Sequence, residues 1–385
     1  MQHKTTKTLA AAVLALMLST SAYAFEKPVL LQDQGSFFAG GTTVTTPGSF
    51  VFSNPLNPQG QTLHGDHAYV FYQKPVNAHK LPLVFLHGAG QSKKTWETTP
   101  DGRDGFQNIF LERGYATYLV DQPRRGDAGQ ATVDGTVSAT TNDQFWFSNF
   151  RVGDAPEFFK GVQFSKDPAA LDQYYRQMTP NTAPYDQSVV VNALSAVFDK
   201  SGDGVLITHS QGGGPGWRIA IKNPKVRAVI SYEPGSSFVF PQGEEPEAIP
   251  TSSPFGPLQP ETVTLDEFMQ LTKIPIVIYY GDNIAENYTD EWNKDSWRIR
   301  LDMAHKFAAA VNRHGGDCTV VHLPEIGVTG NTHFPFSDLN NVQIADLMQN
   351  WLHEKAWINK NLKSPANKAG LLLLTDTLFI FRELQ

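Results

Sequence analysis

Cysteine is almost missing from this sequence, since Cys318 is the only one among 385 residues. A single cysteine cannot form a disulfide within the chain, so the fold must be stabilised by packing rather than by cross-links. The sequence also lacks the paired cysteines and the His-x-x-x-His spacing that zinc sites use. We therefore expect a protein that works without a metal ion or another cofactor.

The chain also has no excess of basic residues over acidic ones. The chain has 31 lysines and arginines against 38 aspartates and glutamates, which gives a formal net charge of -7. Nucleic acid is therefore not an expected partner, because it is bound by basic surfaces. Hydrophobic residues make up 41% of the chain, which is enough to build a sizeable core.

The N-terminal apolar run is too short to cross a bilayer. Two lysines precede this run, Leu9–Leu18, and small residues follow it at Ala22 and Ala24. This order of charge, apolar run and small residues predicts a signal peptide over residues 1–24. We expect the protein to be exported, to the periplasm or the extracellular space, without a stable membrane anchor.

Apolar segments alternate with helical segments, which predicts one α/β domain over residues 25–360 with a mostly parallel sheet flanked by helices. Two antiparallel edge strands are expected upstream, at Phe37–Thr46 and Ala68–Gln73. The other expected strands are Leu81–Leu86, Ala116–Val120, Gly204–Thr208, Val226–Tyr232, Ile274–Tyr280 and Thr319–Leu323. The expected helices are Trp96–Arg113, Gln187–Lys200, Gly212–Asn223, Asp295–His314 and Val342–Lys355. Residues 361–385 form a tail to which we assign no role.

The segment 131–186 interrupts this alternation and is rich in aromatic residues. We expect it to be a cap insertion over the functional site, with Phe145, Trp146 and Phe147 lining a substrate pocket. The alternative is a peripheral packing unit that does not contact a substrate.

A strand that runs directly into a serine and then a helix is the pattern of a nucleophile elbow. Ser210 stands in this position after Gly204–Thr208. A serine on such a sharp turn needs small residues two positions before and after it, and Thr208 and Gly212 fill those positions. Thr208 departs from the usual glycine. The pattern predicts the α/β-hydrolase fold with Ser210 as the nucleophile.

A second small-residue turn follows the strand Leu81–Leu86. It reads His87-Gly88-Ala89-Gly90. Its place predicts an oxyanion hole made by the backbone N–H groups of Ala89 and Gln211, where small residues let the backbone approach the substrate. We expect His87 to pack below the loop.

The general base is expected in the loop after the final strand, and His333 lies there within Gly330-Asn331-Thr332-His333-Phe334. His322 is the rival, but it falls inside the expected strand. His305 and His314 belong to a helix and its end.

Two carboxylates compete to orient the base. Asp282 follows the later strand, where the acid usually lies in proteins of this fold. Glu233 follows the strand next to the elbow strand, and its extra methylene gives it the reach from there. The physical argument permits either residue.

Several short runs resemble a small family of secreted bacterial esterases of the α/β-hydrolase superfamily, over about residues 30 to 356. The runs are Trp96–Arg103, Gly114-Tyr115, Asp121-Gln122, Ser210, Glu233-Pro234-Gly235 and Gly330–His333. The triad of that family is Ser, Glu and His, with the glutamate after the sixth strand. Position by position, the resemblance implies Ser210, Glu233 and His333.

The expected function is that of a serine carboxylesterase, which hydrolyses a small-molecule ester through an acyl-enzyme intermediate. Thioesterases, acyltransferases and peptidases share this mechanism. A different alternative is a ligand-binding protein that has kept the fold without catalysis.

Overall fold

The computed structural model describes residues 28–361, with side chains described as far as residue 355. The predicted signal peptide and the tail beyond residue 361 lie outside the described residues. The strands are β1 (Leu31–Thr45), β2 (Thr62–Pro75), β3 (Leu83–Leu86), β4 (Thr117–Asp121), β5 (Gly153–Asp154), β6 (Glu157–Phe158), β7 (Gly204–His209), β8 (Val226–Tyr232), β9 (Val239–Pro241), β10 (Glu261–Val263), β11 (Pro275–Tyr280) and β12 (Asp317–His322).

Helices lie between the strands and at the end of the described chain. The α-helices are α2 (Phe106–Glu112), α3 (Asp143–Asn149), α4 (Pro168–Arg176), α5 (Gln187–Ser201), α6 (Gly213–Lys222), α7 (Leu265–Leu271), α8 (Trp292–Arg313) and α9 (Asn341–Asn361). The short 3-10 helices are η1 (Lys93–Trp96), η2 (Gly126–Ala128), η3 (Ser210–Gly212) and η4 (Leu323–Ile326).

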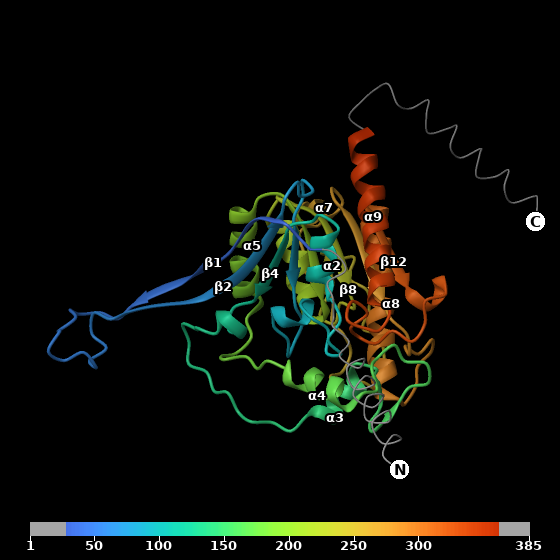
Figure 1. Cartoon of the computed structure of the whole chain (residues 1–385), viewed down its shortest axis with the longest axis horizontal. Helices are drawn as coiled ribbons and strands as arrows, with labels where there is room; N and C mark the ends of the chain where they lie inside the picture. The colour runs from blue at the N-terminus through green and yellow to red at the C-terminus, as the bar shows by residue number, and fades with distance from the viewer. Residues whose placement is uncertain (1–27, 362–385) are drawn as a thin grey trace, which may run out of the picture.

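Eight strands form one sheet in the order β1-β2-β4-β3-β7-β8-β11-β12. The six strands from β4 to β12 are parallel, whereas β1 and β2 pair antiparallel, as expected for the edge. Helices α5, α6 and α7 contact one another in a row, and α2 contacts α9. Figure 1 shows α5 and α2 on opposite sides of the sheet. This arrangement confirms the predicted α/β-hydrolase fold.

The inner strands are apolar at nearly every position because helices cover both faces of the sheet. All residues of β3 and β7 are buried. Their register places Phe85 opposite Ile207 and Leu86 opposite Thr208. Because these strands are parallel, their carboxyl ends lie at the same edge of the sheet. The loops at that edge carry the site described below.

The helix predicted over Trp96–Arg113 is wrong in its first half. The structure has a 3-10 helix that ends at Trp96, and α2 begins only at Phe106. Between them, Pro100 lacks the backbone N–H that a helix interior requires, and Gly102 has a φ of 86°, in the left-handed region.

The starts of α4 and α5 are fixed by local side chains. Asp186 Oδ1 accepts hydrogen bonds from the backbone N–H groups of Ser188 at 2.9 Å and Val189 at 3.3 Å. Asp167 caps α4 in the same way, and Pro168 takes the first helical position, where no N–H is needed.

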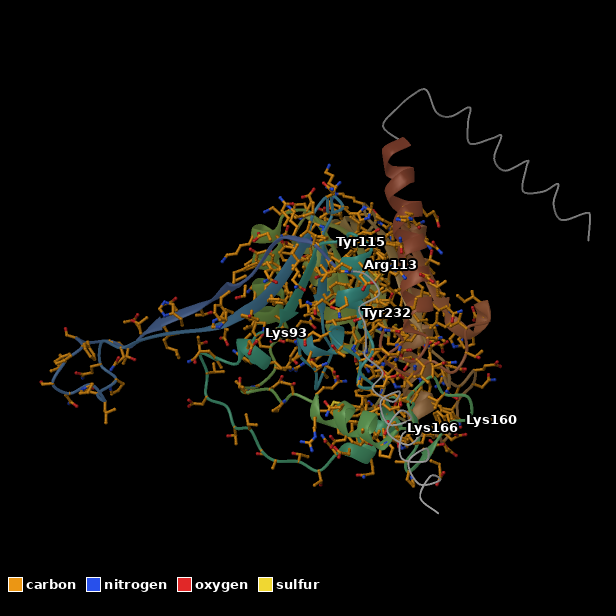
Figure 2. All side chains as sticks on the ribbon, in the orientation of Figure 1. Lys93, Arg113, Tyr115, Lys160, Lys166 and Tyr232 are labelled. Carbon is orange, nitrogen blue, oxygen red and sulfur yellow. The ribbon has the colours of Figure 1, made fainter. Side chains whose placement is uncertain are left out.

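The hairpin of β1 and β2 extends beyond the body of the molecule (Figure 1). Its end exposes large apolar side chains, among them Phe52, which is 90% exposed, and Leu56, which is 94% exposed. Figure 2 shows the end of the hairpin standing apart from the rest of the molecule, while Tyr232 at the end of β8 lies in the packed body.

The threonine that replaces the usual elbow glycine is accommodated by a glycine on the neighbouring helix. Thr208 is buried in β7 and donates a hydrogen bond from Oγ1 to Ser231 Oγ at 2.8 Å. Its methyl group faces Gly216 on α6, where an added Cβ would lie 2.7 Å from Thr208 Cγ2 and 3.7 Å from the next atoms of Thr208. Gly216 therefore provides the space that the threonine methyl needs.

We expect Gly216→Ala to lower the free energy of unfolding by about 1–3 kcal/mol, because the new methyl overpacks the core. Adding Thr208→Ser removes the opposing Cγ2 and should recover much of this loss, so the two changes are not additive. Urea unfolding of the single and double variants measures the coupling. Additive losses would contradict the assigned contact.

Candidate active site

Three loops carry the side chains of the predicted triad, and each loop follows the carboxyl end of a parallel strand. Ser210 follows β7, Glu233 follows β8, and His333 lies in the loop that comes after β12 and η4. The three strands belong to the same sheet, so these ends meet at one edge. The structure therefore brings the three predicted residues into one place.

Ser210 occupies a strained turn that the surrounding small residues make possible. Its φ is 53°, in the left-handed region, and the residue is 6% exposed. An added Cβ on Gly88 would lie 2.6 Å from Ser210 Cβ, and one on Gly212 would lie 2.8 Å from the carbonyl oxygen of His87. Larger residues at either position would collide with the turn.

His333 is fully buried and held on several sides. Its ring stacks on Phe150, with centroids 4.6 Å apart, and lies 4.1 Å from the Trp297 ring. Its Nδ1 is 3.1 Å from Glu233 Oε2. Its Nε2 has no hydrogen-bond partner among the described residues. A buried ring nitrogen without a partner is a free proton acceptor.

Glu233 is a fully buried carboxylate with three partners. Besides His333, it accepts a hydrogen bond from Arg151 Nη2 at 2.6 Å and one from the backbone N–H of Gly281, both on Oε1. The residue itself has a φ of 52°. A buried charge requires partners of this kind, since an isolated carboxylate is strongly disfavoured away from water.

Asp282, the competing acid, does not contact His333. Its Oδ1 accepts from the backbone N–H of Asn283 at 2.6 Å, and its Oδ2 accepts from that of Gly330 at 2.7 Å. The carboxylate therefore holds the start of the loop that carries His333, while Glu233 takes the place beside the imidazole.

The remaining histidines considered in the sequence lie outside the site. His322 ends β12, and its Nδ1 is 3.6 Å from Glu325 Oε1. His314 hydrogen-bonds to Glu244 at 3.0 Å, and His305 is exposed on α8.

The environment of His333 favours its neutral form. Burial lowers the pKa of His333 well below its usual value, and the positive charges of Arg151 and Arg300 lower it further. Beneath the loop, Asp338 accepts hydrogen bonds from Thr332 N at 2.7 Å and Thr332 Oγ1 at 2.8 Å. Burial raises the pKa of Asp338 to about 7.

The loop predicted to hold an oxyanion is fixed from behind. His87 Nδ1 donates to Gly88 O at 3.0 Å, and burial lowers the pKa of His87 to about 4, so the ring is neutral. Arg125 donates to Gly88 O at 2.7 Å and to Gln211 Oε1 at 3.3 Å. The backbone N–H groups of Ala89 and Gln211 donate to no acceptor in the described part of the chain.

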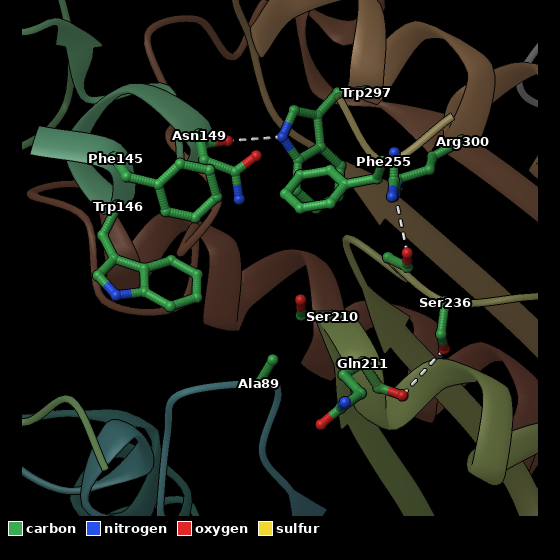
Figure 3. Close-up of a pocket in the computed structure, with 11 residues that line it drawn as sticks. Ala89, Phe145, Trp146, Asn149, Ser210, Gln211, Ser236, Phe255, Trp297 and Arg300 are labelled. Atoms are coloured by element: carbon green, nitrogen blue, oxygen red, sulfur yellow. Dashed lines mark hydrogen bonds between the residues drawn. The ribbon is translucent and has the colours of Figure 1, made fainter. Parts of the chain in front are cut away.

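A cavity of about 390 Å³ opens above Ser210. Figure 3 shows Phe145 and Trp146 on one side of this space, with Trp297 and Arg300 across from them. Its lining residues are Ala89, Phe145, Trp146, Asn149, Ser210, Gln211, Gly235, Ser236, Phe255, Trp297 and Arg300. Four of these lining residues are aromatic, and one, Arg300, is cationic.

The prediction that Phe147 lines the pocket is wrong. Phe145 and Trp146 lie on the face of α3 that borders the cavity, but Phe147 points into the core, where it is 2% exposed and packs 5.0 Å from the Phe158 ring. Adjacent residues of a helix are turned by about 100°, so three consecutive side chains cannot share one face.

Several residues of the site could not be identified from the sequence. Arg151, which pairs with Glu233, lies in the segment 131–186, and Phe255 lies in the Pro-rich segment after β9. Trp297 and Arg300 come from α8. The spacing of three residues on one helix is the only sequence signal that links the last two.

Two absences concern residues 28–361. Within that range no group of three or more His, Cys, Asp or Glu side chains is arranged to hold a metal ion. None of the helices there combines the length and apolar character that a membrane span requires.

Comparison with known proteins agrees with the fold. The sequence model of the Alpha/beta hydrolase family matches residues 83–329. A protein described as a probable secreted lipase, phiG, from a fungus (Fungal sp., strain ATCC 74256) is 28% identical over 313 residues, which are 74% of this chain and 86% of that protein. A solved structure described as a novel bacterial esterase is 31% identical and covers 86% of this chain and 98% of its own, with a TM-score of 0.68.

The two faces of α3 should respond differently to truncation. We expect Phe147→Ala to lower the free energy of unfolding by about 3–5 kcal/mol, because it leaves a buried cavity. Trp146→Ala should instead change the relative kcat/KM for esters of different acyl size, because Trp146 borders the cavity. Thermal unfolding and an ester series measure both effects. Equal responses of the two variants in both assays would contradict the placement.

Proposed function

The chain belongs to the Alpha/beta hydrolase family, and we propose that it is a serine carboxylesterase whose triad is Ser210, His333 and Glu233. One observation carries the proposal. A buried imidazole has its Nδ1 against a carboxylate and its Nε2 free, at the strand edge where a serine occupies a left-handed turn. The relatives described as an esterase and a lipase support an ester as the substrate.

The proposed reaction begins with attack of Ser210 Oγ on the ester carbonyl carbon, while its proton passes to His333 Nε2. The leaving alcohol takes that proton as the C–O bond of the ester breaks, which leaves an acyl group on Ser210. Water then attacks the acyl carbonyl, gives its proton to His333, and the carboxylic acid is released as the serine regains its proton.

Glu233 has the role of orienting the base. Its Oε2 accepts a hydrogen bond from the Nδ1–H of His333, which directs Nε2 toward the reacting hydroxyl and stabilises the imidazolium during each transfer. Arg151 is a positioning residue in this scheme, since it fixes the other carboxylate oxygen at 2.6 Å and does not touch the reacting atoms.

The negative charge that develops on the carbonyl oxygen is assigned to the backbone N–H groups of Ala89 and Gln211. Neither group has an acceptor among residues 28–361, and both residues border the cavity. Such preorganised donors each lower the barrier by roughly 2.7–4 kcal/mol in acyl transfer.

The segment 131–186 acts, in this proposal, as a cap that shapes the substrate pocket. Phe145, Trp146 and Asn149 of the cap border the cavity. The aromatic lining suits an apolar acyl or alcohol group of a small ester. We further propose that the protein is exported, to the periplasm or outside the cell, after removal of residues 1–24.

Ser210→Ala should keep the fold and lower kcat for an aryl ester by several orders of magnitude, because only binding and oxyanion stabilisation remain. A fluorophosphonate probe should label the wild-type protein at Ser210 and leave the variant unlabelled, as mass spectrometry of the peptides can show. Near-normal turnover of the variant would overturn the proposed function.

The pH profile should reveal the lowered pKa of His333. As a base, His333 acts when neutral, so kcat/KM rises as pH passes its pKa and levels off above it. We expect the inflection well below 6.5. Arg151→Gln removes a positive charge that disfavours the imidazolium, so the inflection should move to higher pH. An inflection above 6.5 in the wild type, or no upward movement in the variant, would contradict this reading.

A further inference from the structure

Among the described residues that line the cavity above Ser210, Arg300 is the charged one. It lies on α8, one turn after Trp297, and its guanidinium stands over the indole ring with its carbon 5.2 Å from the ring centroid. In Figure 3 it faces Phe145 and Trp146 across the space above the serine.

Two of the three guanidinium nitrogens of Arg300 are fixed by backbone carbonyls. Nε donates to Gly235 O at 2.8 Å, and Nη1 donates to Ser296 O. Nη2 makes no hydrogen bond within the described part of the chain. The side chain is therefore held in place and still has donors available for a ligand.

Arg300 also lacks an acidic partner among the described residues. The groups that act on its charge are Tyr280 and Arg151, and neither is a carboxylate. Arg298, on the same helix, is by contrast paired with Asp295 at 2.6 Å. Burial lowers the pKa of Arg300 to about 10, which leaves the guanidinium charged at neutral pH.

The site as a whole is short of negative charge. Arg151 and Arg300 both act on His333, whereas Glu233 is the carboxylate beside it and is already paired with Arg151. A half-buried cation that has no carboxylate partner among the described residues, in a cavity lined partly by aromatic rings, favours an anionic ligand.

Gly235 places this cation close to the reacting serine. A Cβ added to Gly235 would lie 3.2 Å from Ser210 Oγ and 3.2 Å from the Trp297 ring, and the carbonyl of the same glycine accepts from Arg300. Gly235 therefore lies against both the nucleophile and the guanidinium, so a ligand of a few carbon atoms can reach both.

From these contacts we propose that the substrates are esters that carry a free carboxylate, such as half-esters of dicarboxylic acids, and that Arg300 binds this carboxylate. The inference rests on the proposed esterase function. Guanidinium–carboxylate bonds are charge-assisted and can be bidentate, whereas a neutral group of the same shape gains neither effect.

The test compares pairs of esters that differ only in charge. A pH-stat measures the rate of hydrolysis from the acid that is released. Monoethyl adipate and its carboxamide analogue place the charge on the acyl side. Acetoxyvalerate and acetoxyvaleramide place it on the alcohol side. For at least one pair we expect kcat/KM of the mature wild-type protein to be roughly 10–100-fold higher for the charged ester.

Variants identify the residue responsible. Arg300→Gln should reduce the charged-to-neutral ratio to near one, and Arg300→Lys should retain much of it. Arg227→Gln is the matched control, since Arg227 is exposed at the start of β8 and its loss changes the net charge equally. The control should keep the wild-type ratio. The wild-type ratios test the inference even when an Arg300 variant does not fold.

A neutral ester hydrolysed as well as its charged partner in both pairs would overturn this inference and leave the esterase function intact. A ratio that persists in a folded Arg300→Gln variant would overturn the role of Arg300. Absence of turnover for all four esters and for neutral aryl esters would overturn the esterase function itself.

Discussion

The site depends on one buried carboxylate. Glu233 lies at the end of β8 without contact to solvent, and burial of an ionised group is tolerated only when its oxygens are hydrogen-bonded. One oxygen faces His333 and the other meets Arg151 and the N–H of Gly281. These partners come from three separate parts of the chain, so the sheet edge, the loop after β12 and the segment 131–186 must all be in place for the charge to be satisfied.

The segment 131–186 is for this reason more than a cover. Its Arg151 pairs with the Glu233 carboxylate, and its Phe150 stacks on the His333 ring. The backbone N–H of Thr179 donates a hydrogen bond to Gly90 O, in the loop that follows β3. The same segment also contacts the start of the loop that carries His333, where the backbone N–H of Gln163 donates a hydrogen bond to Gly330 O at 2.7 Å. A substitution in this segment that reshapes the cavity therefore also disturbs the contacts of His333 and Glu233, because the segment packs against both residues.

Local patterns were enough to predict the sheet, the turn at Ser210 and the place of His333, since each depends on neighbouring residues. Contacts between segments that are distant in the sequence could not be predicted from it. The Arg151–Glu233 bond joins residues 82 positions apart, and nothing in the sequence around either one indicates it. The choice between Glu233 and Asp282 was left open by the residues for the same reason, because reach and loop direction are properties of the folded chain. Phe147 was misplaced because an aromatic run alone does not say which face of a helix is buried.

The most direct test of the account compares kcat/KM of Glu233→Gln and Asp282→Asn, measured on folded protein well below each unfolding midpoint. An amide at 233 cannot stabilise the imidazolium or hold its tautomer, so we predict a loss of roughly 10⁴-fold. The Asp282 carboxylate only holds loop N–H groups, and its amide should reduce stability by about 1–3 kcal/mol while changing kcat/KM less than tenfold. A large loss of turnover in Asp282→Asn together with a small one in Glu233→Gln would contradict the account.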